Sequence, residues 1–245
     1  MHSHNDSAVG KLCANRKDLV IYNQTNMSRI YPDFTRIRSD NYSPLIAWYC
    51  GCQMIALNFQ TSDEYLRLND GRFRTNGGCG YVLKPQNMLQ EHYVDSHMEY
   101  TSLKVEVLSA ARLPKPKGQR RGECIDPYVI VTLWDVNPRD RKETKTSFRT
   151  NTVRNNGFCP IFDSEHSKFH FEVKRQDIAM LQFTVWDEDY ASIDDFIGSA
   201  AIPISCVRNG IRSVQIFNAQ NTASGVFDVA NLLVDVKVKH SEMSI

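Results

Sequence analysis

The chain has 245 residues, of which 42% are hydrophobic, so it is long enough and apolar enough to bury one large core or two smaller ones. Its 29 lysines and arginines almost cancel its 28 aspartates and glutamates, so there is no overall basic field to drive binding to nucleic acid. No run of eighteen apolar residues is present and the start lacks the features of a secretory signal, so we expect a soluble intracellular protein.

Residues 1–85 mix helical and strand patterns. Five apolar side chains near the start fit one helical face: Val9, Leu12, Cys13, Leu19 and Val20. Strands are predicted at 27–31, at 53–59 and, after a glycine-rich turn, at 81–83, with a helical piece at 44–49. This alternation is typical of a β/α barrel. Only about four strands are predicted where a closed barrel needs eight, so we expect half a barrel.

Residues 86–102 are polar and have no periodicity, which predicts a linker that packs over the surface. About eight strands are predicted beyond it, at 103–108, 128–134, 144–149, 168–173, 181–186, 196–204, 212–217 and 232–238. Leu181, Phe183 and Val185 alternate with polar residues, which indicates that one face of the strand is buried. Two such sheets packed together make a β-sandwich.

The seven cysteines form an odd number with no repeated pair spacing, which argues against a disulfide framework and predicts reduced thiols. Cys50 and Cys52 are the one pair that could begin a zinc site. One intervening residue is not the usual spacing, however, and no second pair follows at the distance a zinc finger requires, so we do not expect a metal there.

Three stretches of residues 1–85 resemble the second catalytic box, or Y box, of eukaryotic phosphoinositide-specific phospholipases C. They are Arg-Ile-Tyr-Pro at 29–32 continuing to Arg-Ser-Asp-Asn-Tyr-Ser-Pro at 38–44, then Trp-Tyr-Cys-Gly-Cys-Gln-Met-Ile-Ala-Leu-Asn-Phe-Gln-Thr at 48–61, then Asn-Gly-Gly-Cys-Gly-Tyr-Val-Leu-Lys-Pro at 76–85. The later strands resemble the C2 domain of that family at Asp-Pro-Tyr-Val (126–129), Asn-Asn-Gly-Phe (155–158) and Asp-Phe-Ile-Gly (195–198). The resemblance covers nearly the whole chain.

The resemblance implies an incomplete, half TIM-type β/α barrel followed by an antiparallel eight-stranded C2 β-sandwich. The expected division is the half-barrel at 1–85, a linker at 86–102, the C2 domain at 103–240 and a tail at 241–245. Because the match begins almost at residue 3, inside the fold, the start is expected to be cut. We expect the open strand edges and uncovered apolar residues of a half-barrel to cause aggregation or to need the missing barrel half as a partner.

The implied activity is hydrolysis of phosphatidylinositol 4,5-bisphosphate to diacylglycerol and inositol trisphosphate in intracellular signalling, with a catalytic calcium. In that family the catalytic histidines, the calcium-binding carboxylates and the phosphate-gripping lysines lie in the first half of the barrel, which this chain does not contain. We expect none of its seven histidines at the end of a barrel strand, so the chain alone is predicted to be inactive. The alternative is a non-catalytic adaptor that binds calcium and phospholipid through its C2 domain.

Two substrate contacts carry over from the family, Arg29 and Tyr31, both at the end of a predicted barrel strand. A guanidinium there can hold a ring phosphate by paired hydrogen bonds, and the tyrosine two residues on points the same way and can pack against the inositol. The alternative is an arginine paired with a nearby carboxylate and a tyrosine in the core. A third contact, Ser3, matches the family's serine less well.

Four aspartates resemble the loop ligands of calcium-binding C2 domains: Asp126, Asp187, Asp189 and Asp195. Calcium takes about six to eight oxygen ligands, and carboxylates on adjacent loops can supply several. Many such domains carry another aspartate six residues before the Asp-Pro pair, where this chain has Arg120. The resemblance therefore implies an incomplete cage and weak calcium binding completed by lipid or water.

A basic loop precedes Asp126 and contains Lys115, Lys117, Arg120 and Arg121. We expect it to attract an anionic phospholipid membrane and to place the protein in the cytoplasm, peripherally at the inner face of the plasma membrane. The alternative is a solvated charged loop. The run at 139–145 mixes both signs and is expected to be an ordinary exposed face.

Overall fold

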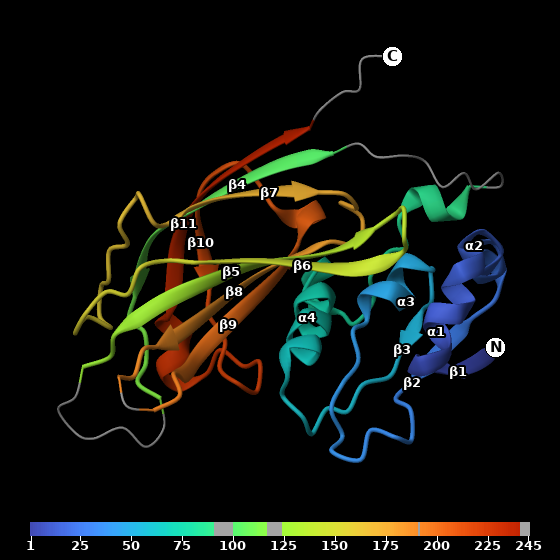
Figure 1. Ribbon diagram of the computed structural model, residues 1–245, viewed down its shortest axis with the longest axis horizontal. Coiled ribbons are helices and arrows are strands. Elements are labelled where there is room, and N and C mark those ends of the chain that lie inside the picture. The colour runs from blue at the N-terminus through green and yellow to red at the C-terminus, as the bar shows by residue number, and fades with distance from the viewer. Residues whose placement is uncertain (91–99, 117–123, 191, 241–245) are drawn as a thin grey trace.

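A computed structural model gives the structure of the chain and describes residues 1–90, 100–116, 124–190 and 192–240 (Figure 1). A small sheet with helices occupies one end of the molecule, and two larger sheets occupy the other. Of the described helices, none is long and apolar enough to cross a membrane. The fold predicted from the sequence, half of a β/α barrel joined to an antiparallel sandwich, is confirmed.

Three parallel strands form the sheet of the half-barrel, in the order β1-β2-β3. They are β1 (His2–Asn5), β2 (Ser28–Tyr31) and β3 (Met54–Ile55). The helices are α1 (Asp6–Leu12) and α2 (Arg16–Thr25) between β1 and β2, α3 (Leu45–Tyr49) between β2 and β3, and α4 (Glu64–Phe73) after β3. Parallel neighbours need such crossovers, which is why strands and helices alternate in this part of the sequence.

The half-barrel differs from the sequence prediction at two strands. The strand expected at 53–59 is reduced to the two residues of β3, which pairs with β2 alone among the described strands. The strand expected at 81–83 is not formed, and Tyr81 and Leu83 are 78% and 86% exposed. An extended segment becomes a strand only when a neighbour pairs with its backbone, and no described strand lies beside this one.

Eight antiparallel strands form the sandwich. They are β4 (Thr101–Ala111), β5 (Pro127–Asn137), β6 (Lys142–Arg149), β7 (Lys168–Val173), β8 (Met180–Asp187), β9 (Asp195–Pro203), β10 (Gly210–Gln215) and β11 (Asn231–His240). One sheet has the order β10-β11-β4-β7 and the other has the order β6-β5-β8-β9. Alternate side chains such as Val105, Val131 and Val234 fill the core between them.

The two parts of the chain share a second hydrophobic core. Trp134 and Met180 of the sandwich lie in one cluster with Ile30, Leu45 and Leu68 of the half-barrel, and all five side chains are at most 1% exposed. Helix α4 of the half-barrel lies against β9 of the sandwich in this contact (Figure 1). The half-barrel and the sandwich are therefore packed together and not merely tethered.

The segment predicted as a linker contributes to this packing. Met88 is fully buried, and the side chain of Gln24 donates hydrogen bonds to the carbonyl oxygens of Met88 (3.0 Å) and Gln90 (2.9 Å). Strand β4 begins at Thr101, so the end of the predicted linker belongs to the sandwich. Residues 91–99 of this linker lie outside the described residues, as do residues 241–245 of the predicted tail.

The mixed-charge run at 139–145 is also part of the interface, which corrects the expectation of an ordinary exposed face. Arg141 donates a hydrogen bond to the carbonyl oxygen of Cys13 at 3.2 Å. Lys145 pairs with Glu64 of α4 at 2.7 Å and lies 4.3 Å from the ring centroid of Trp134. These charges face the half-barrel because the turn between β5 and β6 extends over it.

The prediction of reduced thiols throughout is wrong for one pair, because Cys13 and Cys50 form a disulfide that joins the ends of α1 and α3. Spacing alone did not indicate it, since 37 residues separate the two cysteines and only the fold brings them together. Cys50 is thus not a zinc ligand. Burial also raises the pKa of the Cys52 thiol to about 11, which disfavours the thiolate that zinc binding needs.

Candidate functional site

The three predicted substrate-contacting residues lie together on one face of the parallel sheet. Ser3 of β1 is the register partner of Arg29 in β2, and Asn5 is the partner of Tyr31. The guanidinium carbon of Arg29 lies 5.6 Å from the ring centroid of Tyr31. In parallel strands, register partners point to the same side, so Ser3, Arg29 and Tyr31 share a surface near the carboxyl ends of the strands.

This face is open to solvent. Ser3 and Arg29 are exposed and Tyr31 is 37% exposed, whereas Ser28 and Ile30, which alternate with them in β2, are buried. No carboxylate of the described residues is within ion-pair distance of Arg29. The alternative of a paired arginine and a core tyrosine therefore does not describe these side chains.

Two histidines lie in a barrel strand, although neither is its last residue. His2 and His4 lie in β1, a strand that the sequence did not predict because it has no apolar alternation. The ring centroid of His2 is 5.2 Å from that of Tyr22 in α2, so it packs on the helix side of the sheet. Side chains alternate along β1, so both histidines point away from the face that carries Ser3.

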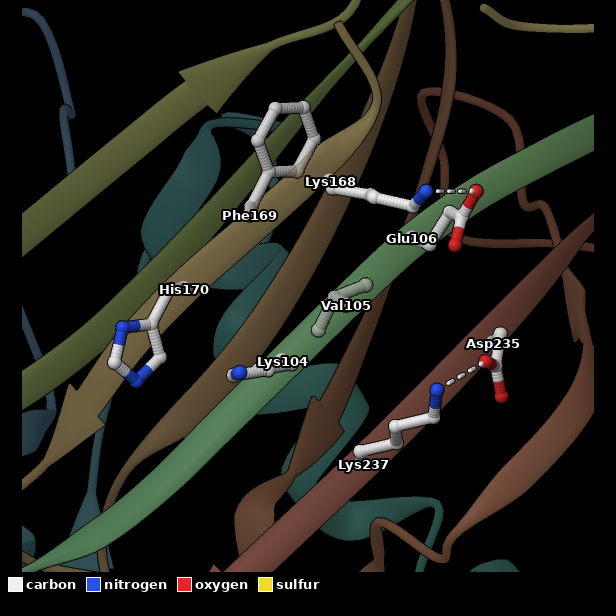
Figure 2. A pocket seen from close by; sticks show the side chains of 8 residues that line it. All are labelled: Lys104, Val105, Glu106, Lys168, Phe169, His170, Asp235 and Lys237. Atoms are coloured by element: carbon white, nitrogen blue, oxygen red, sulfur yellow. Dashed lines mark ion pairs between the residues drawn. The ribbon is translucent and has the colours of Figure 1, made fainter. Parts of the chain in front are cut away.

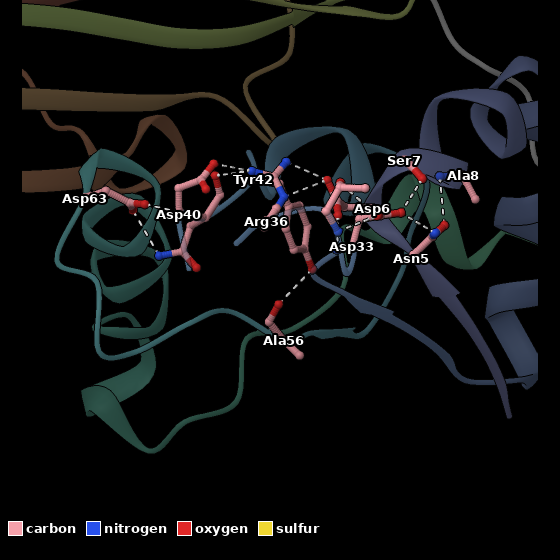
Figure 3. Close-up of polar contacts among 12 residues, drawn as sticks. Asn5, Asp6, Ser7, Ala8, Asp33, Arg36, Asp40, Tyr42, Ala56 and Asp63 are labelled. Atoms are coloured by element: carbon pink, nitrogen blue, oxygen red, sulfur yellow. Dashed lines mark hydrogen bonds and ion pairs between the residues drawn. The ribbon is translucent and has the colours of Figure 1, made fainter. Parts of the chain in front are cut away.

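A hydrogen-bond network around Asp33 fixes the loop that follows β2 (Figure 3). Asp33 Oδ2 accepts hydrogen bonds from the side chains of Asn5 (2.5 Å) and Ser7 (2.8 Å), and Oδ1 accepts from the backbone N–H and hydroxyl of Thr35. The bonds from Thr35 and Ser7 lower the pKa of the Asp33 carboxyl, so it is ionised at neutral pH. The network ties the loop to the end of β1 and the start of α1.

Arg36 extends this network along the loop (Figure 3). Its guanidinium pairs with Asp6 at 2.6 Å and with Asp40 at 2.9 Å, and it donates to the carbonyl oxygen of Asn41 at 3.0 Å. Asp6 Oδ1 in turn accepts from the backbone N–H of Asp33 at 2.6 Å. The carboxylates beside the strand ends are thus occupied by protein donors.

The loop is also joined to the segment after β3. The side chain and backbone of Asn41 bond to Asp63, the residue that caps the start of α4 by accepting from the N–H of Leu66 at 3.0 Å. The hydroxyl of Tyr42 donates to the carbonyl oxygen of Ala56 at 2.9 Å. The loops that follow β2 and β3 are therefore joined by hydrogen bonds beside Arg29 and Tyr31.

The tip of the loop after β2 is apolar and exposed. Phe34 and Ile37 are 91% and 92% exposed, although the residues around them are anchored by the Asp33 and Arg36 bonds. No described part of the chain covers these two large apolar side chains. Neither residue was predicted from the sequence. The pattern that could have indicated them is two apolar residues separated by polar ones shortly after the Arg-Ile-Tyr-Pro motif.

The four aspartates predicted as calcium ligands lie at one end of the sandwich. Asp126 precedes β5, Asp187 ends β8, Asp189 follows it and Asp195 begins β9. Asp187 is 3% exposed and its Oδ1 accepts from the backbone N–H of Asp126 at 2.6 Å. Asp126 Oδ2 is 3.0 Å from Nη1 of Arg154.

These carboxylates do not converge on a common point. In the described part of the chain, one group alone brings three metal-binding side chains within 4.8 Å of one another, namely Asp163, Glu165 and His166, and all three are exposed. The predicted aspartates are not among them. Of the basic loop, Lys115 is exposed, while Lys117, Arg120 and Arg121 lie outside the described residues.

A hollow of about 290 Å³ lies on β4, β7 and β11 and carries several charged side chains (Figure 2). Lys168 pairs with Glu106 at 3.6 Å and Lys237 with Asp235 at 3.5 Å, so carboxylates balance two of its three lysines. It is formed by strands of the sandwich, away from the parallel sheet, and is separate from the surface around Arg29.

The chain matches two family models. The one described as phosphatidylinositol-specific phospholipase C, Y domain, matches residues 1–87, and the C2 domain model matches residues 101–221.

Among curated proteins, the chain is 39% identical over 233 residues to human "Inactive phospholipase C-like protein 2", covering 91% of this chain and 20% of that protein. It is 38% identical over 222 residues to human "1-phosphatidylinositol 4,5-bisphosphate phosphodiesterase gamma-2", covering 89% of this chain and 17% of that protein. The crystal structure of PLC21 from S. officinalis superposes with a TM-score of 0.79 at 30% identity, covering 99% of this chain and 30% of that one. The chain thus spans about a fifth of the length of these curated relatives.

Proposed function

We infer the function of this chain from its family: it belongs to the phosphoinositide-specific phospholipase C family, as the Y domain and the C2 domain, and we propose that its half-barrel holds the headgroup of phosphatidylinositol 4,5-bisphosphate. The observation that carries the proposal is the common exposed face of Ser3, Arg29 and Tyr31 at the carboxyl ends of parallel strands. Ligand sites of β/α barrels lie at that end of the strands.

Each of the three side chains suits an inositol phosphate. The guanidinium of Arg29 has no carboxylate partner among the described residues, so its N–H groups are available for two parallel hydrogen bonds to a phosphate. The hydroxyl of Ser3, on the neighbouring strand, can donate to the same group or to a ring hydroxyl. The ring of Tyr31 offers an apolar surface to the C–H face of the inositol.

The position of Phe34 and Ile37 supports a substrate that is presented in a membrane. These exposed side chains lie on the loop that follows Arg29 and Tyr31, so they would enter the lipid layer when the headgroup reaches the site. We propose that the protein is cytoplasmic and binds peripherally to anionic phospholipid at the inner face of the plasma membrane, with the C2 domain as a second contact.

The reaction proposed for the whole protein is hydrolysis of this lipid to diacylglycerol and inositol trisphosphate with a catalytic calcium. The carboxylates nearest the strand ends do not fit a calcium ion, because Asp33 and Asp6 are saturated by protein donors. His2 and His4 point to the other side of the sheet. We therefore propose that this chain, with its half-barrel at 1–85 followed by a linker and the C2 domain, binds the headgroup without splitting it.

The second candidate is a non-catalytic adaptor that binds phospholipid. The names of the inactive phospholipase C-like relatives, at 39% identity, favour it. It shares the headgroup site and differs in that the whole protein releases no inositol trisphosphate.

Flotation with phosphatidylcholine vesicles that carry phosphatidylinositol 4,5-bisphosphate tests the headgroup site. We expect Arg29→Met to weaken binding about tenfold to a hundredfold, since each charge-assisted hydrogen bond contributes about 1.5–3 kcal/mol. The affinity of Arg29→Lys is expected to lie between those of wild type and Arg29→Met. Arg139→Met is the matched control, because Arg139 is an exposed arginine in the β5–β6 turn. Equal losses for Arg29→Met and Arg139→Met would mean that only net charge matters, and the assigned site would be wrong.

A further inference from the structure

Arg154 joins three loops at the end of the sandwich where the C2 family implies calcium. Its Nη1 is 3.0 Å from Oδ2 of Asp126, before β5, and its Nη2 is 2.5 Å from Oε2 of Glu188, after β8. The guanidinium carbon lies 4.5 Å from the ring centroid of Tyr190. One side chain from the segment between β6 and β7 thus bridges carboxylates on both neighbouring loops.

A second arginine reinforces the bridge. Arg149 pairs with Glu188, and its guanidinium carbon lies 3.6 Å from the ring centroid of Tyr128. The hydroxyl of Tyr128 donates to Asp194 at 2.7 Å, and Asp194 accepts from the backbone N–H of Asp189 at 3.0 Å. In the described residues, protein cations and hydrogen-bond donors therefore connect these loops.

Two further carboxylate oxygens accept hydrogen bonds from the backbone. Oδ1 of Asp126 accepts from the N–H of Asn155 at 2.6 Å, and Oδ1 of Asp187 accepts from the N–H of Asp126 at 2.6 Å. A calcium ion takes about six to eight oxygens at about 2.3–2.6 Å, arranged around one centre. No three of the described carboxylates at this end of the sandwich lie within 4.8 Å of one another, so the described donor set does not fit calcium.

We propose that Arg154 is a tethered counter-ion that takes the place of a metal ion between Asp126 and Glu188 and closes these loops without calcium. A cation fixed on the chain needs no binding from solution, so the loops keep this arrangement at any calcium concentration. A calcium ion would have to displace the guanidinium and break both of its ion pairs. Removing the Arg154 charge leaves Asp126 without its ion pair and Glu188 with its ion pair to Arg149, so the two carboxylates together are less compensated and more attractive to a divalent cation.

Calcium titrations of the full chain test the proposal, with isothermal calorimetry as the readout and Tb³⁺ luminescence sensitised by Tyr190 as a second one. The wild-type chain is expected to show no saturable binding in the range of about 10⁻⁴–10⁻³ M where weak calcium modules bind. Arg154→Gln is expected to bind at least tenfold more tightly than wild type. Arg154→Lys keeps the charge and is expected to behave like wild type.

Two further variants make the result specific. The double change Arg154→Gln with Asp126→Asn is expected to lose the gained affinity, and Arg139→Gln, at the far end of β5, is expected to change nothing. Saturable binding by wild type that Asp126→Asn removes would overturn the proposal, as would a folded Arg154→Gln chain that gains no affinity. The wild-type titration can overturn the proposal by itself, so the test still works if a variant fails to fold. None of these outcomes depends on the headgroup site at Arg29.

Discussion

Asp135 is a carboxylate buried inside the protein. It is 2% exposed, and its two oxygens accept from the backbone N–H groups of Val136 (2.7 Å) and Lys174 (2.6 Å). Burial raises the pKa of its carboxyl from 3.8 to about 6 in spite of these bonds. Between these two pH values the folded state holds a proton that the unfolded state has released.

This raised pKa predicts that Asp135 stabilises the fold below about pH 4 and loses that contribution as the pH rises to about 6. The free energy of unfolding of wild type relative to Asp135→Asn should fall by about 2–3 kcal/mol from pH 4 to 7, at about 1.4 kcal/mol per unit of pKa shift. Urea denaturation at a series of pH values measures it.

Asp163→Asn is the control with the opposite sign. The backbone N–H of Glu165 and the ring of His166 lower the pKa of the Asp163 carboxyl, so its contribution is present at neutral pH and is lost as the pH falls. A difference between wild type and Asp135→Asn that stays constant across the pH range would contradict the assignment.

Residues on one strand were predictable and residues on different loops were not. The alternation of a strand places Arg29 and Tyr31 on the same side from the sequence alone, and the register of β1 added Ser3. Arg154 is 28 positions from Asp126, and no local pattern indicates that the two side chains meet. The same holds for Asp33, whose partners Asn5 and Ser7 lie on another element.

Helix α4 can lie against β9 because it carries Gly71 at the contact. A Cβ atom at this position would be 2.4 Å from the backbone carbonyl oxygen of Ala201. Arg67 and Arg74 flank it, with guanidinium carbons 4.3 Å and 3.4 Å from the ring centroids of Phe196 and Phe217. A backbone atom cannot move aside as a side chain can.

Gly71→Ala is therefore expected to lower the free energy of unfolding by about 1–3 kcal/mol, the usual cost of overpacking, although alanine is the better helix former. Gly10→Ala in α1 is the matched control. No atom lies within 4 Å of the Cβ it would add, so this change should be neutral or stabilise by up to about 1 kcal/mol. Chemical denaturation of both variants checks the contrast, and equal effects would refute the role of Gly71.

The elements that the sequence missed lack apolar periodicity. Strand β1 consists of His-Ser-His-Asn, and helix α4 is mostly polar with a glycine inside it. The side chain of Asp63 caps α4, and tertiary contacts to β9 hold it. Such elements form because of their neighbours, and a pattern read along one segment does not contain that information.

The whole molecule combines a two-sheet sandwich with a small parallel sheet. Among the described strands, β1 and β3 each pair with β2 alone, so both leave an edge of the parallel sheet unpaired. Tyr81 and Leu83, in the segment expected to add a further strand, are exposed. We propose that a complementary barrel half covers these edges and that the chain alone tends to associate through them.

At this scale the sequence predicted the two folds but not their docking. Eight alternating strands indicate a sandwich, since each strand shows its buried face in its own pattern. The sequence does not indicate the core that Trp134 and Met180 share with the half-barrel, because both residues are also compatible with the interior of the sandwich.

We propose that the parallel strands bind an inositol phosphate through Ser3, Arg29 and Tyr31. Hydrogen–deuterium exchange of the dilute chain with and without inositol trisphosphate, read by mass spectrometry, tests it most directly. We expect slower exchange in peptides covering 2–5 and 28–44, and loss of this protection in Arg29→Met. Protection confined to the sandwich, or none at a saturating concentration of the ligand, would contradict it.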